Sequence, residues 1–307
     1  MNSEKWIKEN LHPLKNKRVA VTGSTGGLGK ELCAYLASLG AQLVLLDRNA
    51  ERSKAHADAI CERYPEITVE RITLDLEDIV SADAAVRELA KLGVDIFIHN
   101  AGAYSIPRHI CTTGYENVFQ INFATPYYMI KKLLPHLRER GGRVIAVGSI
   151  AHNYSHIDGG DTDFRTRKAA SKVYGNAKRY LMFGLHELMK DEGDVRFSVA
   201  HPGITFTNIT AHYPKPVFAV IKYPMKVIFM KPSKAALSIL KGTCEDTEYC
   251  TWIGPRIFDV WGLPKKRRLN TCSAEESERI AVIAEDVYSQ CERTVAQKAQ
   301  STEVTKE

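Results

Sequence analysis

The fold of this chain is decided by residues 17–29, which read Lys17-Arg18-Val19-Ala20-Val21-Thr22-Gly23-Ser24-Thr25-Gly26-Gly27-Leu28-Gly29. The first six residues predict a short buried strand, and apolar residues at helical spacing over residues 30–39 predict a helix directly after the glycines. A glycine-rich turn between strand and helix lets the backbone approach a pyrophosphate, whose charge then faces the N–H groups of the helix start. The turn therefore predicts a dinucleotide site formed by Gly23, Ser24, Thr25, Gly27, Leu28 and Gly29.

The next predicted strand, residues 41–46, ends at Asp47 and Arg48. A carboxylate at this place can accept hydrogen bonds from the ribose hydroxyls of NAD, whereas an arginine can pair with the 2′-phosphate of NADP. The two residues give opposite indications. Because Asp47 would repel a phosphate directly, the sequence favours NAD and leaves NADP open through Arg48.

Tyr174 and Lys178 lie four residues apart in a helix predicted over residues 168–189. This spacing is about one helical turn and places both side chains on the same face. A phenol with a pKa of about 10 exchanges protons poorly at neutral pH. A nearby ammonium favours the phenolate and lowers that pKa, so the pair indicates a general acid or base. Without the glycine-rich turn upstream, the same spacing would fit a solvated helix face.

Strand and helix patterns alternate along the chain. Further strands are predicted over residues 68–74, 94–99, 143–148 and 195–200, and further helices over 82–92 and 114–137, the latter interrupted near Pro126. Such alternation is typical of a parallel sheet covered by helices on both faces, with ligands bound at the carboxyl ends of the strands. We therefore expect the α/β class, a Rossmann-type doubly wound sheet in a single domain.

Composition narrows the function. The chain has 307 residues, 44% of them apolar, and a formal charge of +6 carried by scattered basic residues. The densest basic run, residues 265–268, is interpreted as a solvated loop, and no nucleic-acid partner is expected. The seven cysteines are dispersed without metal-type spacing, so reduced thiols and no metal site are predicted. No stretch of 18 apolar residues occurs, which predicts a cytoplasmic protein without a membrane span.

Over residues 16–255 the chain resembles the short-chain dehydrogenase/reductase family. The motifs that carry this resemblance, beyond the glycine turn and the Tyr174/Lys178 pair, are Asp75-Leu76, Asn100-Ala101-Gly102-Ala103, Asn122, Ser149, and Pro202-Gly203 followed by Thr207. Within the family the chain is most similar to the branch of retinol dehydrogenases and hydroxysteroid dehydrogenases, because Ser149 stands 25 positions before Tyr174 and His201 begins a His-Pro-Gly turn. Asp47 departs from that branch, which usually has a small residue before the arginine and prefers NADP.

The resemblance implies a catalytic set of Asn122, Ser149, Tyr174 and Lys178. Tyr174 would exchange a proton with the substrate oxygen, and Ser149 would hydrogen-bond that oxygen. Lys178 would lower the pKa of Tyr174 and hold the nicotinamide ribose, while Asn122 would disturb its helix and fix a relay water. The implied cofactor contacts, besides the glycine turn and the Asp47–Arg48 pair, are Asp75, Leu76, Asn100, Ala101, Gly102, Tyr174, Lys178, Pro202, Gly203 and Thr207. The family analogy also implies a homo-oligomer.

The substrate is expected to be apolar. A lid predicted at about residues 205–232 is rich in aromatic, β-branched and methionine side chains, with lysines at intervals. The reaction expected is hydride transfer between NAD(P) and a secondary alcohol or ketone on a hydroxysteroid or bile acid. The alternatives are a retinol-type or other lipophilic carbonyl substrate, and a dinucleotide-sensing protein without turnover. The lysines of the lid also fit peripheral membrane contact, although a lid packed on the core is favoured.

Both ends of the chain are predicted to be extensions of the domain at 16–255. Residues 1–15 form an N-terminal helical extension with Trp6, Ile7 and Leu11 facing the domain. Residues 256–307 form a C-terminal helical extension, in which a capping box at 273–276 opens a helix through about Val287. The polar residues from Arg293 onward are expected to fray.

Overall fold

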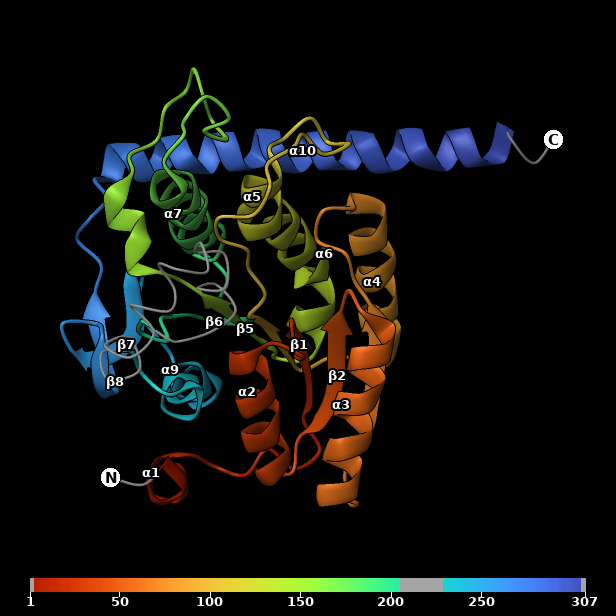
Figure 1. Cartoon of the computed structure of the whole chain (residues 1–307), viewed down its shortest axis with the longest axis vertical. Coiled ribbons are helices and arrows are strands. Elements are labelled where there is room, and N and C mark those ends of the chain that lie inside the picture. Colours follow the sequence, from red (N-terminus) through yellow and green to blue (C-terminus); the bar gives the residue numbers. More distant parts are fainter. Residues whose placement is uncertain (1–2, 205–228, 305–307) are drawn as a thin grey trace, which may run out of the picture.

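The computed structural model describes residues 3–204 and 229–304, and at its centre lies one eight-stranded sheet (Figure 1). The strand order is β3-β2-β1-β4-β5-β6-β7-β8, and all neighbours are parallel except β7 and β8. The strand bounds are β1 Arg18–Thr22, β2 Gln42–Asp47, β3 Val69–Thr73, β4 Ile96–His99, β5 Arg143–Val147, β6 Arg196–Ala200, β7 Thr251–Ile257 and β8 Trp261–Arg268. The order reverses between β1 and β4, which confirms the doubly wound prediction and marks a crevice at the carboxyl ends of these two strands.

Helices cover both faces of the sheet. One hydrophobic core lies under α4 (Ile79–Leu92), α6 (Thr125–Glu139), α7 (Ala170–Leu188) and α10 (Ala274–Val304). The other lies under α1 (Ser3–Asn10), α2 (Gly27–Ser38), α3 (Ala50–Arg63) and α9 (Pro232–Cys244). Between residues 114 and 137 the predicted single helix is instead a short α5 (Asn117–Phe119), a π-helical turn η1 (Gln120–Ala124) and α6. The interruption therefore precedes Pro126, which sits in the first turn of α6.

The far edge of the sheet is a β7–β8 hairpin that the sequence did not predict. The expectation of a solvated loop at residues 265–268 was wrong, because these basic residues belong to β8 and pair with β7, for example Gly254 with Lys265. An edge strand exposes one side to water, so it tolerates charged residues that an inner strand would not. The domain boundary expected at residue 255 falls within β7, and the sheet continues beyond it to Arg268.

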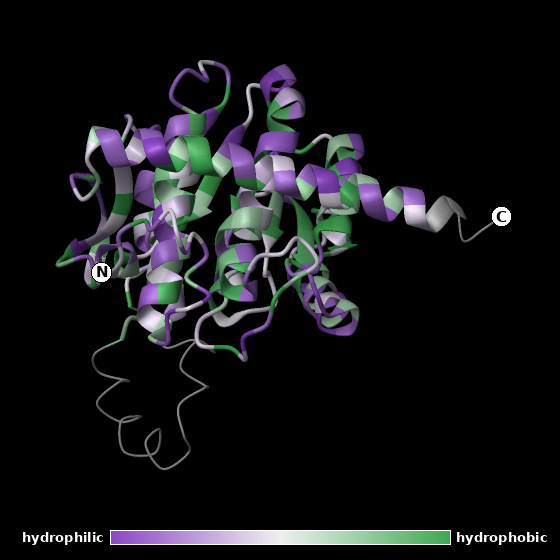
Figure 2. Cartoon of the chain, turned by 90° about the horizontal axis from the view of Figure 1, so that it is seen from above, coloured by the Kyte–Doolittle hydropathy of each residue, from purple (hydrophilic) through white to green (hydrophobic). Residues whose placement is uncertain are grey.

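The N-terminal extension is helical as predicted, with Trp6 and Ile7 buried against α9. The C-terminal prediction was wrong, because α10 continues past Val287 and past Arg293 to Val304. The reason is a buried stripe at helical spacing: Ile280, Ala284, Val287 and Cys291 all face the core. The helix crosses α7, α6 and α4, and its end projects beyond the body of the molecule (Figures 1 and 2). None of the helices described has the length and hydrophobicity to cross a membrane.

A buried ion pair joins α10 to the helix that carries Tyr174 and Lys178. The Arg179 side chain is 1% exposed and donates from Nε to Glu276 Oε1 at 2.8 Å. Its other nitrogens donate to Glu276 Oε2, to Thr271 O at 2.6 Å and to His152 O at 3.3 Å. These bonds fix α7, the start of α10 and the segment after β5 relative to one another.

Replacing Glu276 with glutamine removes the counterion of a guanidinium that water does not reach. We expect the free energy of unfolding to fall by about 3 kcal/mol, as is typical when one partner of a buried pair is removed. The matched control is Glu88→Gln, whose carboxylate pairs with Lys91 in solvent, and it should change stability by less than about 0.5 kcal/mol. Urea unfolding of both variants measures this, and equal effects would show that the Arg179–Glu276 pair is screened like a surface pair.

Candidate active site

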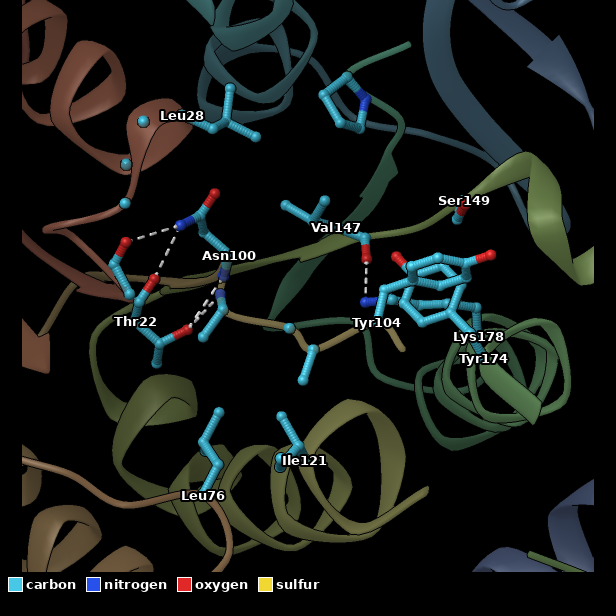
Figure 3. Close-up of a pocket in the computed structure, with 18 of the residues that line it drawn as sticks. Thr22, Leu28, Leu76, Asn100, Tyr104, Ile121, Val147, Ser149, Tyr174 and Lys178 are labelled. Carbon is cyan, nitrogen blue, oxygen red and sulfur yellow. Dashed lines mark hydrogen bonds between the residues drawn. The ribbon is translucent and has the colours of Figure 1, made fainter. Parts of the chain in front are cut away.

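A cavity of about 780 Å³ opens at the carboxyl ends of β1 to β6 (Figure 3). Most of the predicted site residues line it: Gly23, Thr25, Gly27, Leu28, Gly29, Asp47, Arg48, Asp75, Leu76, Asn100, Ala101, Gly102, Ser149, Tyr174, Lys178, Pro202 and Gly203. Ser24 and Asn122 are fully buried and hydrogen-bond to residues of the lining, Ser24 to Asp47 and Asn122 to Ala103. Thr207 and most of the predicted lid lie outside the described residues.

The glycine turn is shaped for close backbone approach. Gly23 has a φ of +67°, which favours glycine, and a Cβ atom at Gly29 would lie 2.2 Å from the Gly23 carbonyl oxygen. Asn100 clamps the turn from the end of β4, since its Nδ2 donates to Thr22 O at 2.9 Å and to Gly23 O at 3.2 Å (Figure 3). The turn therefore forms a fixed cradle at the N-terminus of α2, and this cradle fits the pyrophosphate of a dinucleotide.

Asp47 holds the same turn from the other side. Its Oδ1 accepts hydrogen bonds from Thr25 N and Thr25 Oγ1, both at 3.0 Å, and its Oδ2 accepts from Ser24 Oγ and from Ser53 Oγ at 3.0 Å. A carboxylate has about four acceptor positions, so these donors occupy all of them. Protein groups thus take the acceptor positions of Asp47 in this arrangement, and the expectation that it accepts hydrogen bonds from the ribose hydroxyls stays a prediction. The negative charge of Asp47 can still act on a ligand, because every group that donates a hydrogen bond to it is neutral.

Asn122 lies in the π-helical turn η1, as the family resemblance implied when it placed a helix disturbance there. Its Nδ2 donates to Val118 O and to Ala103 O, both at 2.8 Å, and its Oδ1 accepts from Ala103 N at 3.3 Å. A Cβ atom at Gly102 would lie 2.7 Å from Asn122 Oδ1 and 3.7 Å from Lys178 Nζ. The amide thus ties the segment after β4 to η1, directly beside the lysine.

Lys178 is 2% exposed, and its Nζ donates to Val147 O at 2.9 Å at the end of β5 (Figure 3). Burial lowers the pKa of Lys178 to about 7. Tyr174 lies one turn earlier on α7, with Lys178 Nζ 5.7 Å from the centre of its ring. Lys178 is therefore a buried amine that can gain or lose a proton near neutral pH.

The prediction that Lys178, helped by an oxidised nicotinamide ring, lowers the pKa of Tyr174 stays a prediction, since Lys178 is not among the protein groups that shift this pKa. Burial of the phenol raises the pKa of Tyr174 to about 12, the hydrogen bond with Ser149 opposes that rise, and Tyr104 adds to it. Desolvation wins because the pocket wall removes the phenolate from water, while a half-neutral lysine supplies little positive charge. The unassisted phenol is therefore an acid that keeps its proton.

Sequence reasoning missed an aromatic wall beside the Tyr174 hydroxyl. Tyr104 packs edge-to-face on Tyr174 with ring centres 5.4 Å apart, and Tyr154, Ile150 and Phe229 also line the cavity. The signal for Tyr104 was its place directly after Asn100-Ala101-Gly102-Ala103, at the end of a strand. Behind Ser149, His152 Nδ1 contacts Ser149 O at 2.6 Å and fixes the short helix η2 (Ile150–Tyr154).

Comparison with known proteins agrees with this geometry. Residues 17–216 match the family model described as short chain dehydrogenase. The chain belongs to the short-chain dehydrogenase family. It is therefore a nicotinamide-dependent oxidoreductase of alcohol or carbonyl substrates.

Its relatives include proteins named for lipophilic alcohols. Retinol dehydrogenase 13 of Homo sapiens is 30% identical over 209 residues, which are 65% of this chain and 62% of the relative. Polyprenol dehydrogenase of Mus musculus is 26% identical over 241 residues, 75% of this chain and 72% of the relative. A crystal structure of a protein from Mycobacterium Paratuberculosis superposes with a TM-score of 0.72 at 23% identity, covering 94% of this chain and 96% of that one, and it supports the fold alone.

From the lowered pKa of Lys178 we predict how the stability of this short-chain dehydrogenase depends on pH. Below pH 7 the folded state must bury an ammonium, and that cost disappears as the pH rises from about 7 toward the unfolded value of about 10.4. His99 and His201, whose protonated forms Lys178 disfavours electrostatically, have pKa values lowered mainly by burial and stay neutral in this window. Lys178→Met should therefore melt roughly 5 °C above the parent protein at pH 6, and the difference should shrink by pH 9.

Differential scanning calorimetry without nucleotide measures this difference. Lys172→Met, at an exposed position on the same helix, is the control and should show no such dependence on pH. A Lys178→Met difference that stays constant from pH 6 to pH 9 would contradict the lowered pKa.

Proposed function

We propose that this enzyme transfers a hydride between its nicotinamide cofactor and a secondary alcohol or ketone on an apolar substrate, most directly a hydroxysteroid or bile acid. The observation that carries the proposal is the Tyr174–Ser149 pair facing the aromatic wall of the cavity. A hydroxyl pair supplies the polar contacts for one oxygen, and Tyr104, Tyr154 and Phe229 supply apolar contact for a ring system beside it.

The bound cofactor supplies or accepts the hydride, and the protein supplies orientation and protons. In reduction, Tyr174 Oη donates its proton to the carbonyl oxygen, and the Ser149 hydroxyl donates a hydrogen bond to the same oxygen as negative charge develops there. Lys178 Nζ, with a pKa near 7, is suited to return a proton toward the phenolate. In oxidation the same groups act in reverse, and Tyr174 accepts the alcohol proton.

A second candidate substrate is a retinoid or polyprenoid alcohol. Two relatives are named for retinol and polyprenol, and both of these alcohols carry a long apolar chain. The aromatic wall accommodates either a ring system or such a chain. Steady-state rates with a panel of hydroxysteroids, bile acids, retinol and polyprenol separate the two candidates.

Tyr174→Phe removes the proton donor and keeps the ring against Tyr104. We expect turnover to fall by at least about 100-fold, the low end for a general acid, because the substrate oxygen loses its proton source. Nucleotide affinity should change by no more than about twofold, since the phenyl ring is retained. Absorbance at 340 nm measures turnover, and quenching of tryptophan fluorescence measures nucleotide binding.

Tyr64→Phe, at the end of α3 and away from the cavity, is the matched control and should keep parental turnover. Full turnover in Tyr174→Phe would exclude the phenol as the acid. Nucleotide binding by the parent protein without turnover of any substrate class would instead favour the dinucleotide-sensing alternative.

We also propose that NAD is preferred over NADP because of the charge of Asp47. The carboxylate is 4% exposed and its hydrogen-bond donors are neutral hydroxyl and amide groups, so none of these donors offsets its charge toward a ribose phosphate. Arg48 offers the opposite charge, but its side chain is 71% exposed and lies 3.9 Å from Glu77. A solvated, shared arginine attracts a phosphate less than a buried carboxylate repels it.

Asp47→Asn tests this preference. Asparagine keeps the size but loses the charge and part of the acceptor capacity, so affinity for both nucleotides should fall as the glycine turn loosens. The ratio of NADP to NAD affinity should nevertheless rise about tenfold or more. Isothermal titration with each nucleotide gives the ratio, and Asp58→Asn on the exposed face of α3 should leave it unchanged. An unaltered ratio in Asp47→Asn would place nucleotide selection elsewhere.

A further inference from the structure

Exposed apolar side chains gather at the tip of the β7–β8 hairpin. The exposed fractions are 49% for Ile257, 81% for Phe258, 39% for Trp261 and 37% for Leu263. Four of the eight large exposed apolar residues within the described part of the chain therefore lie in seven consecutive positions. A cluster of this kind marks an interaction surface more often than a scattered exposed residue does.

The backbone at this tip is strained. Phe258 and Asp259 have φ values of +50° and +56°, and Val260 N donates to Ile257 O at 2.9 Å, so both central residues of this turn have positive φ, as in a type I′ turn. The connection itself has three residues, because Ile257 pairs with Trp261. Asparagine and glycine are the residues that such a turn favours, and a bulky aromatic residue with positive φ is unfavourable. Phe258 is thus unfavourable in this turn, and its side chain is exposed to solvent. This combination indicates that Phe258 contacts something outside the chain.

Basic residues follow the apolar tip. Residues 256–268 contain five basic residues and one acidic residue, and Arg256, Lys265, Lys266 and Arg268 are all exposed. Asp259, the single acidic residue, is within 3.3 Å of Arg267. Lys266 lies 3.7 Å from Glu245 with its side chain still 48% exposed, so Arg256, Lys265 and Arg268 are the exposed cations whose charge no ion pair among the described residues offsets. An apolar tip with a cationic base is complementary to a bilayer of anionic lipids, whose headgroups lie above an apolar interior.

The spacing along the strand fits that geometry. Lys265 is four residues from Trp261, which is about 13 Å at the rise of a β-strand. Interfacial anchors bury their apolar parts by about 5–10 Å, so a tip inserted to this depth would leave the lysines near the lipid phosphates. A protein partner would fit the apolar cluster equally well, but it would not require this order of apolar tip and cationic base.

The hairpin also lies against the mouth of the active site. A Cβ atom at Gly203, which lines the cavity, would be 2.8 Å from Val260 O and 3.0 Å from Pro255 Cγ. In Figure 1 the hairpin forms the sheet edge opposite α3. The apolar tip and the cavity are therefore connected through one packed segment, Pro202 to Ile204.

We infer that the β7–β8 hairpin docks this enzyme on anionic membrane surfaces, with Phe258 at the inserted tip and Lys265 and Lys266 at the lipid phosphates. Docking would place the cavity mouth next to the phase in which lipophilic alcohols dissolve. The inference goes beyond the proposed function and does not depend on turnover.

Co-sedimentation of the full chain with phosphatidylcholine vesicles, with and without phosphatidylserine, tests the inference. The parent protein should bind the phosphatidylserine vesicles and release them at high salt. Phe258→Asn should weaken binding about tenfold, because one aromatic side chain is lost from the interface. It should not lower the melting temperature, since asparagine tolerates a positive φ. Lys265→Glu with Lys266→Glu should weaken binding by about 30-fold or more.

Matched controls separate the hairpin from general surface effects. Val282→Asn removes an apolar residue that is 65% exposed on α10, and Lys54→Glu with Lys91→Glu changes the net charge equally on α3 and α4. Both controls should bind like the parent protein. Equal loss in the controls, or equal binding to vesicles without phosphatidylserine, would overturn the inference. So would a Phe258→Asn variant that only changes the oligomeric state in light scattering, because the tip would then be a subunit contact.

Discussion

The burial of the Lys178 ammonium is the constraint on which the arrangement of the site depends. A buried amine needs a fixed acceptor, and the carbonyl of Val147 at the end of β5 supplies it at 2.9 Å. The segment after β4 must then pass close to the amine, which requires Gly102 because a side chain there would strike Asn122. The π-helical turn η1 turns Asn122 toward that segment and completes the enclosure. Strand ends, helix and turn are therefore positioned around one nitrogen atom.

Asp47 at the other end of the cavity is held in the same way. Both groups are hydrogen-bonded by neutral dipoles, a carbonyl in the case of Lys178 and hydroxyl and amide groups in the case of Asp47. A counterion would cancel the charge of Asp47, whereas neutral partners fix the position of the carboxylate and leave its charge to act on a ligand. Lys178 has a pKa near 7 because burial disfavours its ammonium form, and its hydrogen-bond acceptor is the neutral carbonyl of Val147.

The sequence predicted the parallel sheet and most of the cavity lining, because inner strands read as continuous apolar runs and each binding segment follows directly after one. It could not predict that Asp47 is saturated, since Ser53 reaches the carboxylate from the next helix and only folding brings the two together. The raised pKa of Tyr174 likewise depends on burial by Tyr104 and its neighbours. The sequence already indicated part of the buried stripe of α10, at Ile280 and Val287. It did not indicate β8, because this edge strand carries basic residues and lacks an alternating pattern of apolar and polar residues.

The features that oppose folding in the described part of the chain include the buried amine of Lys178, the π-helical turn at Asn122 and the left-handed Phe258. The first two converge on the cavity of a short-chain dehydrogenase, where their cost is offset by the placement of groups that handle a proton and a cofactor. Phe258 lies outside the cavity lining, so catalysis gives no account of it. Its place beside exposed Ile257 and Trp261 and ahead of Lys265 is what an interfacial anchor requires. Strain within the cavity and strain at the hairpin thus have different explanations, and the second concerns where the enzyme meets its substrate.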